Sequence, residues 1–214
     1  MPRLHAPSDR RSALLVIDMQ YDFMPGGALA VADGDALVPL INQLGQRFAR
    51  VIVTQDWHPA GHVSFAASHP GRVPFESISL PYGAQTLWPT HCVQDSQGAR
   101  LHHDLHLPHA QLVLRKGCNA QIDSYSAFLE ADRQTPTGLA GYLREHGIES
   151  LYVVGLALDF CVAWSAQDAA RAGFATAVIE DACRAIDLNG SLQAAWQAMR
   201  ELGVERLHSD ALPA

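Results

Sequence analysis

Short apolar segments alternate with amphipathic segments along most of the chain, and this alternation restricts the fold more than any other feature of the sequence. Runs rich in Val, Ile and Leu occupy residues 12–18, 50–55, 111–115, 151–154, 174–179 and 204–207. Stretches with helical spacing of apolar side chains occupy residues 35–49, 136–146, 159–172 and 189–202. Continuous apolar strands that alternate with helices are typical of a parallel sheet covered on both faces. We therefore expect an α/β fold, with one doubly wound parallel sheet of about six strands in a three-layer architecture.

The chain length and one irregular segment define the expected domain organisation. A chain of 214 residues without repeats or linkers suits one domain, so we expect residues 1–214 to form a single unit. Residues 57–110 interrupt the alternation, because they are rich in Pro, Gly, Ser and His and contain eight of the eleven histidines. Irregular segments of this length are usually functional when they are ordered. We expect an insertion that carries a metal site, with a mobile surface loop as the alternative.

Composition and charge exclude several classes of protein. The net charge of −7 argues against a general nucleic-acid-binding protein. No apolar run approaches the roughly 20 residues that span a membrane, and residues 1–11 contain no apolar signal segment. The four cysteines are dispersed without a CxxC pair, which favours reduced thiols (Cys92, Cys118, Cys161 and Cys183). We expect a cytoplasmic protein that binds neither membrane nor nucleic acid.

Chemically active side chains follow four of the predicted strands. Asp18 follows the first strand, Asp56 and His58 follow the second, Lys116 follows the third, and Cys161 lies shortly after the fourth. The carboxyl ends of parallel strands meet at one edge of the sheet, where ligands bind. A single acid at a strand end is usually a turn former or a helix cap. The convergence of all these groups at one edge predicts a catalytic site.

Cys161 and Lys116 are the candidates for nucleophilic chemistry. Cys161 is expected in the first turn of a helix with Asp159 as its N-cap, where the helix dipole and a nearby ammonium favour a reactive thiolate. A small buried apolar residue is the alternative interpretation. Lys116 is the single lysine among fifteen basic residues, so this position is expected to need a compact ammonium that Arg cannot supply. Chance codon usage is the alternative.

Histidines near Asp56 favour a metal site. In an extended segment Asp56 and His58 project to the same side, and His62 and His91 lie within reach in the irregular segment. One carboxylate with two imidazoles suits zinc, iron or manganese. A further group of histidines is expected to be a solvated loop that binds metals only adventitiously (His102, His103, His106 and His109).

Five segments of the chain resemble the nicotinamidases, which belong to the isochorismatase-like cysteine hydrolase superfamily. The resemblance covers about residues 12–207, and its histidine-containing segments are typical of the metal-containing branch. The segments are DMQYDF at 18–23, QDWHPAGHVSF at 55–65, WPTHCV at 88–93, RKGCNAQIDSYSAF at 115–128 and GLALDFCV at 155–162.

The resemblance implies a catalytic triad of Asp18, Lys116 and Cys161. Cys161 would attack the carboxamide of nicotinamide, Asp18 would move the thiol proton to the leaving ammonia, and Lys116 would hold both groups and favour the thiolate. Water would cleave the thioester to give nicotinate, as a step of NAD salvage, and pyrazinamide is a second expected substrate. The backbone amides of Ala157 and Cys161 would form the oxyanion hole beside a cis peptide bond preceding Ala157.

The resemblance also implies a metal centre and a ring pocket. Asp56, His58 and His91 would hold one divalent ion, zinc first and iron or manganese as alternatives, and His62 is a ligand only in some relatives. The pyridine nitrogen would bind this metal. Three aromatic side chains would line the ring pocket, where ordinary core packing is the alternative role (Phe23, Trp88 and Tyr125).

One departure and three alternative functions stay open. The family has Thr or Ser where this chain has Leu158, which puts the support of the nucleophile's turn in doubt. The alternatives are a cysteine amidase for another small carboxamide or carbamoyl compound, a metallohydrolase that uses metal-bound hydroxide, and an inactive binding module of the same fold. A homo-oligomer is compatible with the sequence.

Overall fold

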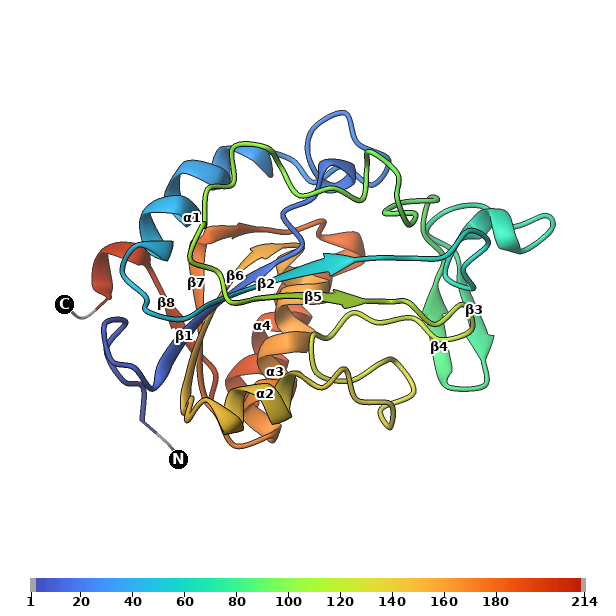
Figure 1. Cartoon of the computed structure of the whole chain (residues 1–214). Helices are drawn as coiled ribbons and strands as arrows, with labels where there is room; N and C mark the ends of the chain where they lie inside the picture. The colour runs from blue at the N-terminus through green and yellow to red at the C-terminus, as the bar shows by residue number, and fades with distance from the viewer. Residues whose placement is uncertain (1–2, 213–214) are drawn as a thin grey trace.

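A six-stranded sheet forms the centre of the computed structural model, which describes residues 3–212 (Figure 1). The strand order is β5-β2-β1-β6-β7-β8, and every pair of neighbouring strands is parallel. The strands are β1 (Ser12–Ile17), β2 (Val51–Asp56), β5 (Leu112–Lys116), β6 (Ser150–Leu156), β7 (Ala175–Arg184) and β8 (Glu205–Leu207). The helices are α1 (Val38–Gly45), α2 (Leu139–Glu145), α3 (Ala163–Arg171) and α4 (Ser191–Glu201).

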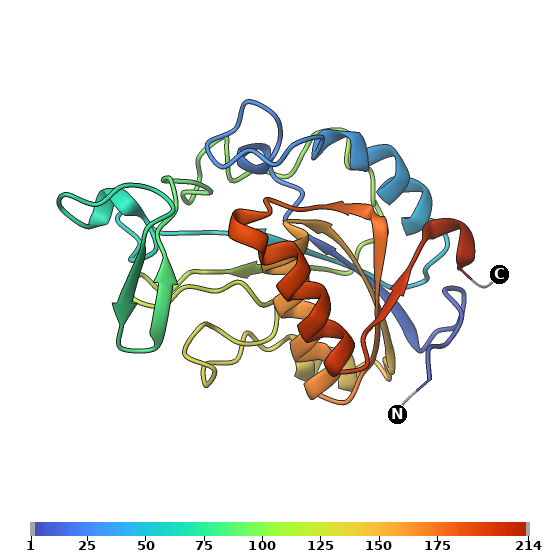
Figure 2. The same ribbon diagram turned by 180° about the vertical axis from the view of Figure 1, so that it is seen from behind.

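Helices cover both faces of the sheet, which confirms the predicted α/β fold. Helix α1 packs on one face, and α2, α3 and α4 pack on the other (Figures 1 and 2). Successive side chains of β1 point to opposite faces, so Leu14 and Val16 join the apolar cluster under α1, whereas Leu15 and Ile17 join the cluster under the other helices. Because both faces are buried, the strand reads as a continuous apolar run.

The turn after β6 and the length of β7 differ from the expectation. The helix predicted at 159–172 begins with one π-helical turn, Leu158–Val162, and continues as α3. Strand β7 extends to Arg184, beyond the predicted end at residue 179, and its register with β6 shifts between Val153 and Gly155. Gly155 has a φ of 115°, and a Cβ there would lie 2.1 Å from a backbone oxygen of β1, so only glycine fits.

The irregular segment contains a hairpin that no alternation in the sequence predicts. Strands β3 (Ser77–Leu80) and β4 (Gly83–Thr86) pair in antiparallel orientation beyond the carboxyl ends of β2 and β5 (Figure 1). Most of their side chains are exposed or half-buried, so neither face carries the apolar pattern of a core strand. The rest of residues 57–110 is held by turns and by isolated bridges.

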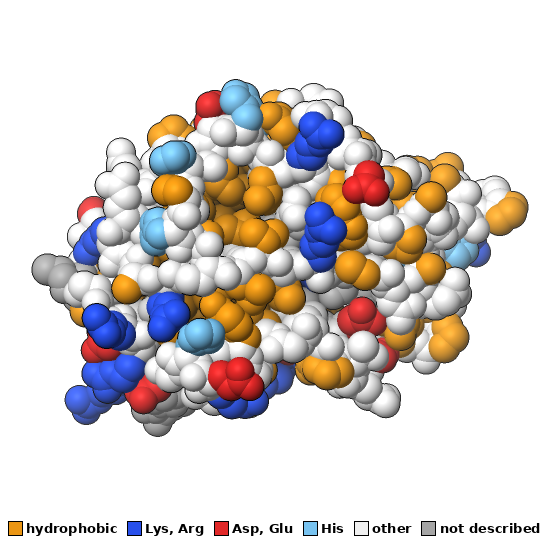
Figure 3. Space-filling view, in the orientation of Figure 1, with side chains coloured by type: hydrophobic (Ala, Val, Ile, Leu, Met, Phe, Trp, Pro, Cys, Tyr) orange, Lys and Arg blue, Asp and Glu red, His pale blue; other side chains and the backbone are white. Residues whose placement is uncertain are grey.

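Strand β5 forms one edge of the sheet. Apolar side chains gather along the middle of the face that Figure 3 shows, over β5, and Val113 of this strand is half exposed. Within residues 3–212, no helix is both long enough and apolar enough to cross a membrane.

Candidate active site

Four neighbouring strands deliver their end residues to one buried point. Asp18 follows β1, Asp56 ends β2, Lys116 ends β5, and Cys161 lies in the π-helical turn after β6. These four strands are adjacent in the order β5-β2-β1-β6, so parallel pairing alone brings their carboxyl ends together. All four side chains are buried. The structure therefore groups the residues that the sequence placed at one edge.

Lys116 lies at the centre of this group. Its Nζ donates to Asp56 Oδ1 at 2.5 Å and to the carbonyl oxygen of Ser124 at 2.9 Å, and it lies 2.9 Å from Asp18 Oδ2 and 3.4 Å from Cys161 Sγ. Burial lowers the pKa of this ammonium, but the two carboxylates outweigh burial and hold the pKa well above its usual value. Lys116 is therefore a permanent cation that joins both acids to the thiol.

Asp18 presents one carboxylate oxygen to the centre of the site. Its Oδ1 accepts a hydrogen bond from Thr54 Oγ1 at 2.5 Å. Its Oδ2 is buried beside Lys116 and has no hydrogen-bond partner of regular geometry within residues 3–212. Burial raises the pKa of Asp18, and Lys116 opposes this rise. A buried carboxylate with a raised pKa, and with one oxygen held only by its ion pair with Lys116, is suited to accept a proton.

Cys161 is a buried thiol rather than a resting thiolate. Burial raises its pKa well above the usual value, the carboxylates of Asp18 and Asp56 raise it further, and only Lys116 lowers it. The direction of this pKa shift opposes the thiolate that the sequence predicts, whereas Lys116, whose Nζ lies 3.4 Å from the sulfur, favours it. The peptide bond between Leu156 and Ala157, just before this turn, is cis.

Asp159 does not cap the helix that follows it. The π-helical turn begins at Leu158, so Asp159 lies inside the turn rather than before it. Its carboxylate accepts hydrogen bonds from the backbone amides of Ile186 and Asp187, at 3.0 and 2.8 Å, and from the hydroxyl of Ser191. The predicted N-cap is therefore wrong, and the side chain ties the turn of Cys161 to the start of α4.

Asp56, His58 and His91 form a buried group that fits a divalent metal. Asp56 Oδ2 lies 3.4 Å from His58 Nε2 and 3.6 Å from His91 Nε2. The Nδ1 atoms of the two histidines face the carbonyl oxygens of Gly117 and Pro89, at 3.0 and 2.8 Å. A carbonyl only accepts, so each Nδ1 carries the hydrogen and each Nε2 keeps its lone pair. One carboxylate and two imidazole lone pairs then converge on one point.

Three further residues hold this group in place and were not singled out from the sequence. Gln20 fixes Asp56 by donating to its carbonyl oxygen and accepting from its amide, both at 2.8 Å. Asp22 accepts from the amide of Cys92 at 2.7 Å and so anchors the loop of His91. A Cβ at Gly117 would lie 2.4 Å from the ring of His58. The sequence signal that could have identified Gln20 and Asp22 was the DMQYDF segment, which contains both residues.

His62 lies beside the candidate metal ligands Asp56, His58 and His91 but does not belong to that group. Its ring stacks at 4.2 Å from the ring of His58, but its Nδ1 pairs with Ser64 Oγ at 2.7 Å and its Nε2 lies 3.3 Å from the carbonyl oxygen of Ile122. Burial lowers the pKa of His62 to about 4, so its ring is neutral at physiological pH. His58, His62 and the buried Asp123 form a second, overlapping group of ligand atoms.

An aromatic pocket opens directly on Cys161. Phe23, Trp88 and Tyr125 line it, as the resemblance implies. Aromatic side chains with a few polar groups beside a thiol are a lining typical of a site for a small ring compound. Four further lining residues were not predicted: Leu29, Asp123, Phe160 and Ile186. The pocket is also lined by three residues with other predicted roles in the site: Asp56, His91 and Ala157.

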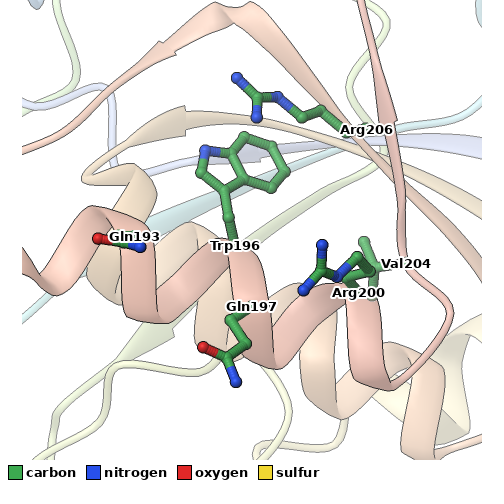
Figure 4. A pocket seen from close by; sticks show the side chains of 6 residues that line it. All are labelled: Gln193, Trp196, Gln197, Arg200, Val204 and Arg206. Carbon is green, nitrogen blue, oxygen red and sulfur yellow. The ribbon is translucent and has the colours of Figure 1, made fainter.

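A second concavity lies on the outer side of α4 and contains none of the predicted site residues. Figure 4 shows the Arg206 guanidinium over the ring of Trp196, at 4.5 Å, beside Arg200. Arg206 is also paired with Glu180. The residues that line this concavity include no nucleophile and no group of candidate metal ligands. The pocket at the strand ends is therefore the candidate for the catalytic site.

Known proteins match this chain over nearly all of its length. The isochorismatase domain family matches residues 12–210. The nicotinamidase of Acinetobacter baylyi is 58% identical over 98% of both chains. The solved structure of an Acinetobacter baumanii nicotinamidase/pyrazinamidase has a TM-score of 0.94 at 60% identity, over 94% of this chain and 98% of that one. The zinc-bound pyrazinamidase of Pyrococcus horikoshii has a TM-score of 0.75 at 31% identity, over 92% and 99% of the two chains.

Proposed function

The chain belongs to the isochorismatase domain family, and on that premise we propose that it hydrolyses nicotinamide to nicotinate and ammonia. Relatives at 58 and 46% identity are nicotinamidases. Pyrazinamide is a second substrate, and NAD salvage is the role that this activity serves. The observation that carries the proposal is the buried contact of Lys116 with Asp18 and Cys161 at the floor of an aromatic pocket.

Cys161 is the nucleophile in this proposal, and Asp18 is its base. The thiol proton passes to Oδ2 of Asp18 as sulfur attacks the carboxamide carbon, so no free thiolate is needed at rest. Lys116 holds Asp18 and Cys161 close together and compensates the negative charge that moves between them. Burial raises the pKa of both Cys161 and Asp18, which supports proton transfer within this pair.

Collapse of the tetrahedral adduct gives a thioester and releases ammonia. The backbone amides of Ala157 and Cys161 donate to the oxyanion, which is the type of interaction that contributes roughly 3–4 kcal/mol per donor. Asp18 returns the proton to the leaving nitrogen and then accepts a proton from the water that cleaves the thioester. Nicotinate leaves and the thiol is restored.

Asp56, His58 and His91 would hold one divalent metal, with zinc as the first candidate and iron or manganese as alternatives. The convergence of one carboxylate oxygen with two imidazole lone pairs supports this assignment, and so does the zinc complex of the Pyrococcus horikoshii relative. When bound, the metal supplies a Lewis acid that anchors the ring nitrogen of the substrate. In this proposal residues 57–110 are the part of the single domain that carries the histidine ligands.

An ammonia-release assay tests the proposed function. Purified protein should release ammonia from nicotinamide and from pyrazinamide, and treatment with a chelator should remove most of this activity. Benzamide, which lacks the ring nitrogen, is the matched control and should react much more slowly. Absence of ammonia release from nicotinamide, with release from another carboxamide in the same panel, would assign the protein to a related amidase instead.

A further inference from the structure

Gln85 is a fully buried polar side chain in an otherwise exposed hairpin. Only Gln85 among the four residues of β4 is buried, with 1% of its surface exposed. The hairpin stands apart from the main sheet (Figures 1 and 2), and none of its residues belongs to either of the two apolar clusters that pack against the sheet. Burial of an amide is unfavourable unless its hydrogen-bonding atoms are satisfied. The position therefore points to a polar role inside the site.

Every polar atom of the Gln85 amide has a partner. Nε2 donates to Asp123 Oδ2 at 2.7 Å and to the carbonyl oxygen of Thr86 at 2.6 Å, and lies 3.2 Å from the hydroxyl oxygen of Tyr125. Oε1 accepts from the hydroxyl of Tyr82 at 2.9 Å. A carboxylate can only accept, so Asp123 fixes which end of the amide faces the site.

Two of these partners line the pocket beside Cys161. Asp123 and Tyr125 are both pocket residues, and both are contributed by the loop after β5 rather than by the hairpin. The Tyr125 hydroxyl also accepts from Trp88 Nε1 at 2.9 Å. Trp88 and Gln85 thus hold this hydroxyl from two sides. Gln85 is thus one of the side chains through which the hairpin meets the loop after β5, and the Tyr82 hydroxyl, which accepts from the Asp123 amide at 3.4 Å, is another.

We propose that Gln85 is a positioning residue for the substrate ring: through its amide, the β3–β4 hairpin fixes the Asp123 carboxylate and the Tyr125 ring that together form one wall of the pocket. This inference rests on the proposed function, because the ring in question is that of nicotinamide. Gln85 does not line the pocket itself, so it acts only through Asp123 and Tyr125.

The chemistry of Asp123 explains why an amide stands at position 85. Asp123 is buried, and its second oxygen accepts from the backbone amide of Ser124, at 2.8 Å. A Glu at position 85 would keep the acceptor for Tyr82 but would face Asp123 with a like charge. A Met would keep the volume but leave the carboxylate without its side-chain donor. In both cases Asp123 and Tyr125 would lose their fixed orientation.

The test compares KM and kcat for nicotinamide in Gln85→Met and Gln85→Glu against the wild type. Gln111→Met is the matched control, because the Gln111 amide also bonds backbone groups, of Val51 and Ala49, but at the opposite end of β5. We expect Gln85→Met to raise KM roughly tenfold with kcat within about threefold, which corresponds to loss of one buried hydrogen-bonded contact. Gln85→Glu should raise KM further, and Gln111→Met should change neither constant.

A double variant separates positioning from general stability. In a Tyr125→Phe background, Gln85→Met should raise KM by a smaller factor than in the wild type, because part of its effect passes through the Tyr125 hydroxyl. If Gln85→Met fails to fold, Tyr82→Phe removes the hydroxyl that donates to Oε1 and accepts from the Asp123 amide, and it should raise KM roughly two- to threefold.

Two results would overturn the inference. One is an unchanged KM in folded Gln85→Met, or in Tyr82→Phe when Gln85→Met does not fold. The other is a double variant whose KM rises by the product of the two single-variant factors, because Gln85 and Tyr125 would then act independently. Wild-type ammonia release is measured first and decides the proposed function by itself, so either of these results, obtained against an active wild type, overturns the inference without touching the proposed function.

Discussion

The two halves of the site come from regions of the molecule that are built differently. Asp18 and Lys116 stand at the ends of β1 and β5, whose register is fixed by backbone pairing within the six-stranded sheet. His58 and His91 come from residues 57–110, where pairing is limited to one short hairpin and isolated bridges. The loop of His91 keeps its place through a side chain of another segment, Asp22.

This difference predicts that the strand ends and residues 57–110 have different roles in the site. In the proposed mechanism the sheet holds the groups that break and form bonds, and packed strands allow little displacement of those groups. In the same proposal the irregular segment carries groups that contact the substrate ring or the metal. Changes at the strand ends should therefore lower kcat, whereas changes in residues 57–110 should mainly raise KM or reduce metal content. Asp56 belongs to both halves, because one oxygen faces Lys116 and the other faces the histidines.

Removal of the nucleophile should have the largest effect. Cys161→Ala should lower kcat by at least about 10⁴-fold, the order seen when a nucleophile is deleted, while nicotinamide still binds in calorimetry. Cys118→Ala, Cys92→Ala and Cys183→Ala are the controls and should keep most of the rate. Substantial turnover by Cys161→Ala would contradict the assignment of Cys161 as the nucleophile, and with it the catalytic role of the strand-end residues.

Replacement of the lysine should come next. Lys116→Arg keeps the charge, but a planar guanidinium cannot donate to Asp18, Asp56 and the Ser124 carbonyl from one point in a fully buried space. We expect kcat to fall about 10- to 10³-fold, the range for misplacement of a catalytic group, with a smaller change in KM. Near-normal kcat would show that charge alone suffices, and the single lysine would then be a matter of chance.

Loss of a histidine ligand should test the other half. His58→Ala or His91→Ala should remove most of the bound metal, as determined by elemental analysis, and raise KM for nicotinamide. His146→Ala is the matched control, because His146 is exposed at the end of α2 and belongs to none of the groups of candidate metal ligands within residues 3–212. Full metal occupancy in either ligand variant would contradict the assigned set.

The pH dependence of thiol alkylation should show a moderate effect. Burial and two carboxylates raise the pKa of Cys161, so its thiolate is scarce at pH 7 and increases with pH across the alkaline range. In a Cys118→Ala background, alkylation of Cys161 by iodoacetamide should be slow at neutral pH and accelerate up to pH 9 and beyond. Rapid alkylation that is independent of pH above 6 would indicate a resting thiolate.

The smallest expected effect concerns Asp159. Asp159→Ala would leave the amides of Ile186 and Asp187 without their acceptor, which should lower the free energy of unfolding by about 1–3 kcal/mol in a urea titration. The alkylation profile of Cys161 should not move, since Asp159 neither caps the helix nor contacts the thiol. A shifted profile would restore a role for Asp159 in activating Cys161.

The sheet half was predictable from the sequence for a physical reason. Strands buried on both faces must be apolar throughout, so their positions are visible as Val/Ile/Leu runs, and parallel pairing then places Asp18, Lys116 and Cys161 at one edge. The helix start at Cys161 was less predictable. Its π-helical turn depends on backbone geometry after β6, and no residue pattern distinguishes it from an ordinary first turn.

The other half was predictable only in part. His58 and His91 could be proposed as ligands by residue type and by resemblance, but the hairpin of Gln85 has no apolar face and hence no periodic signal. Contacts such as Asp22 with Cys92 join residues 70 positions apart. Their existence follows from loop placement, which spacing along the chain does not determine.

Capture of the acyl-enzyme tests the central claim most directly. Wild-type protein should be mixed with excess nicotinamide, quenched in acid during turnover, digested and examined by mass spectrometry. We predict a nicotinoyl group on the peptide that contains Cys161, absent from the Cys161→Ala protein and absent when nicotinamide is omitted. Steady ammonia release from nicotinamide by protein whose Cys161 stays unmodified, and whose Cys161→Ala variant is equally active, would contradict a cysteine mechanism and favour attack by metal-bound hydroxide.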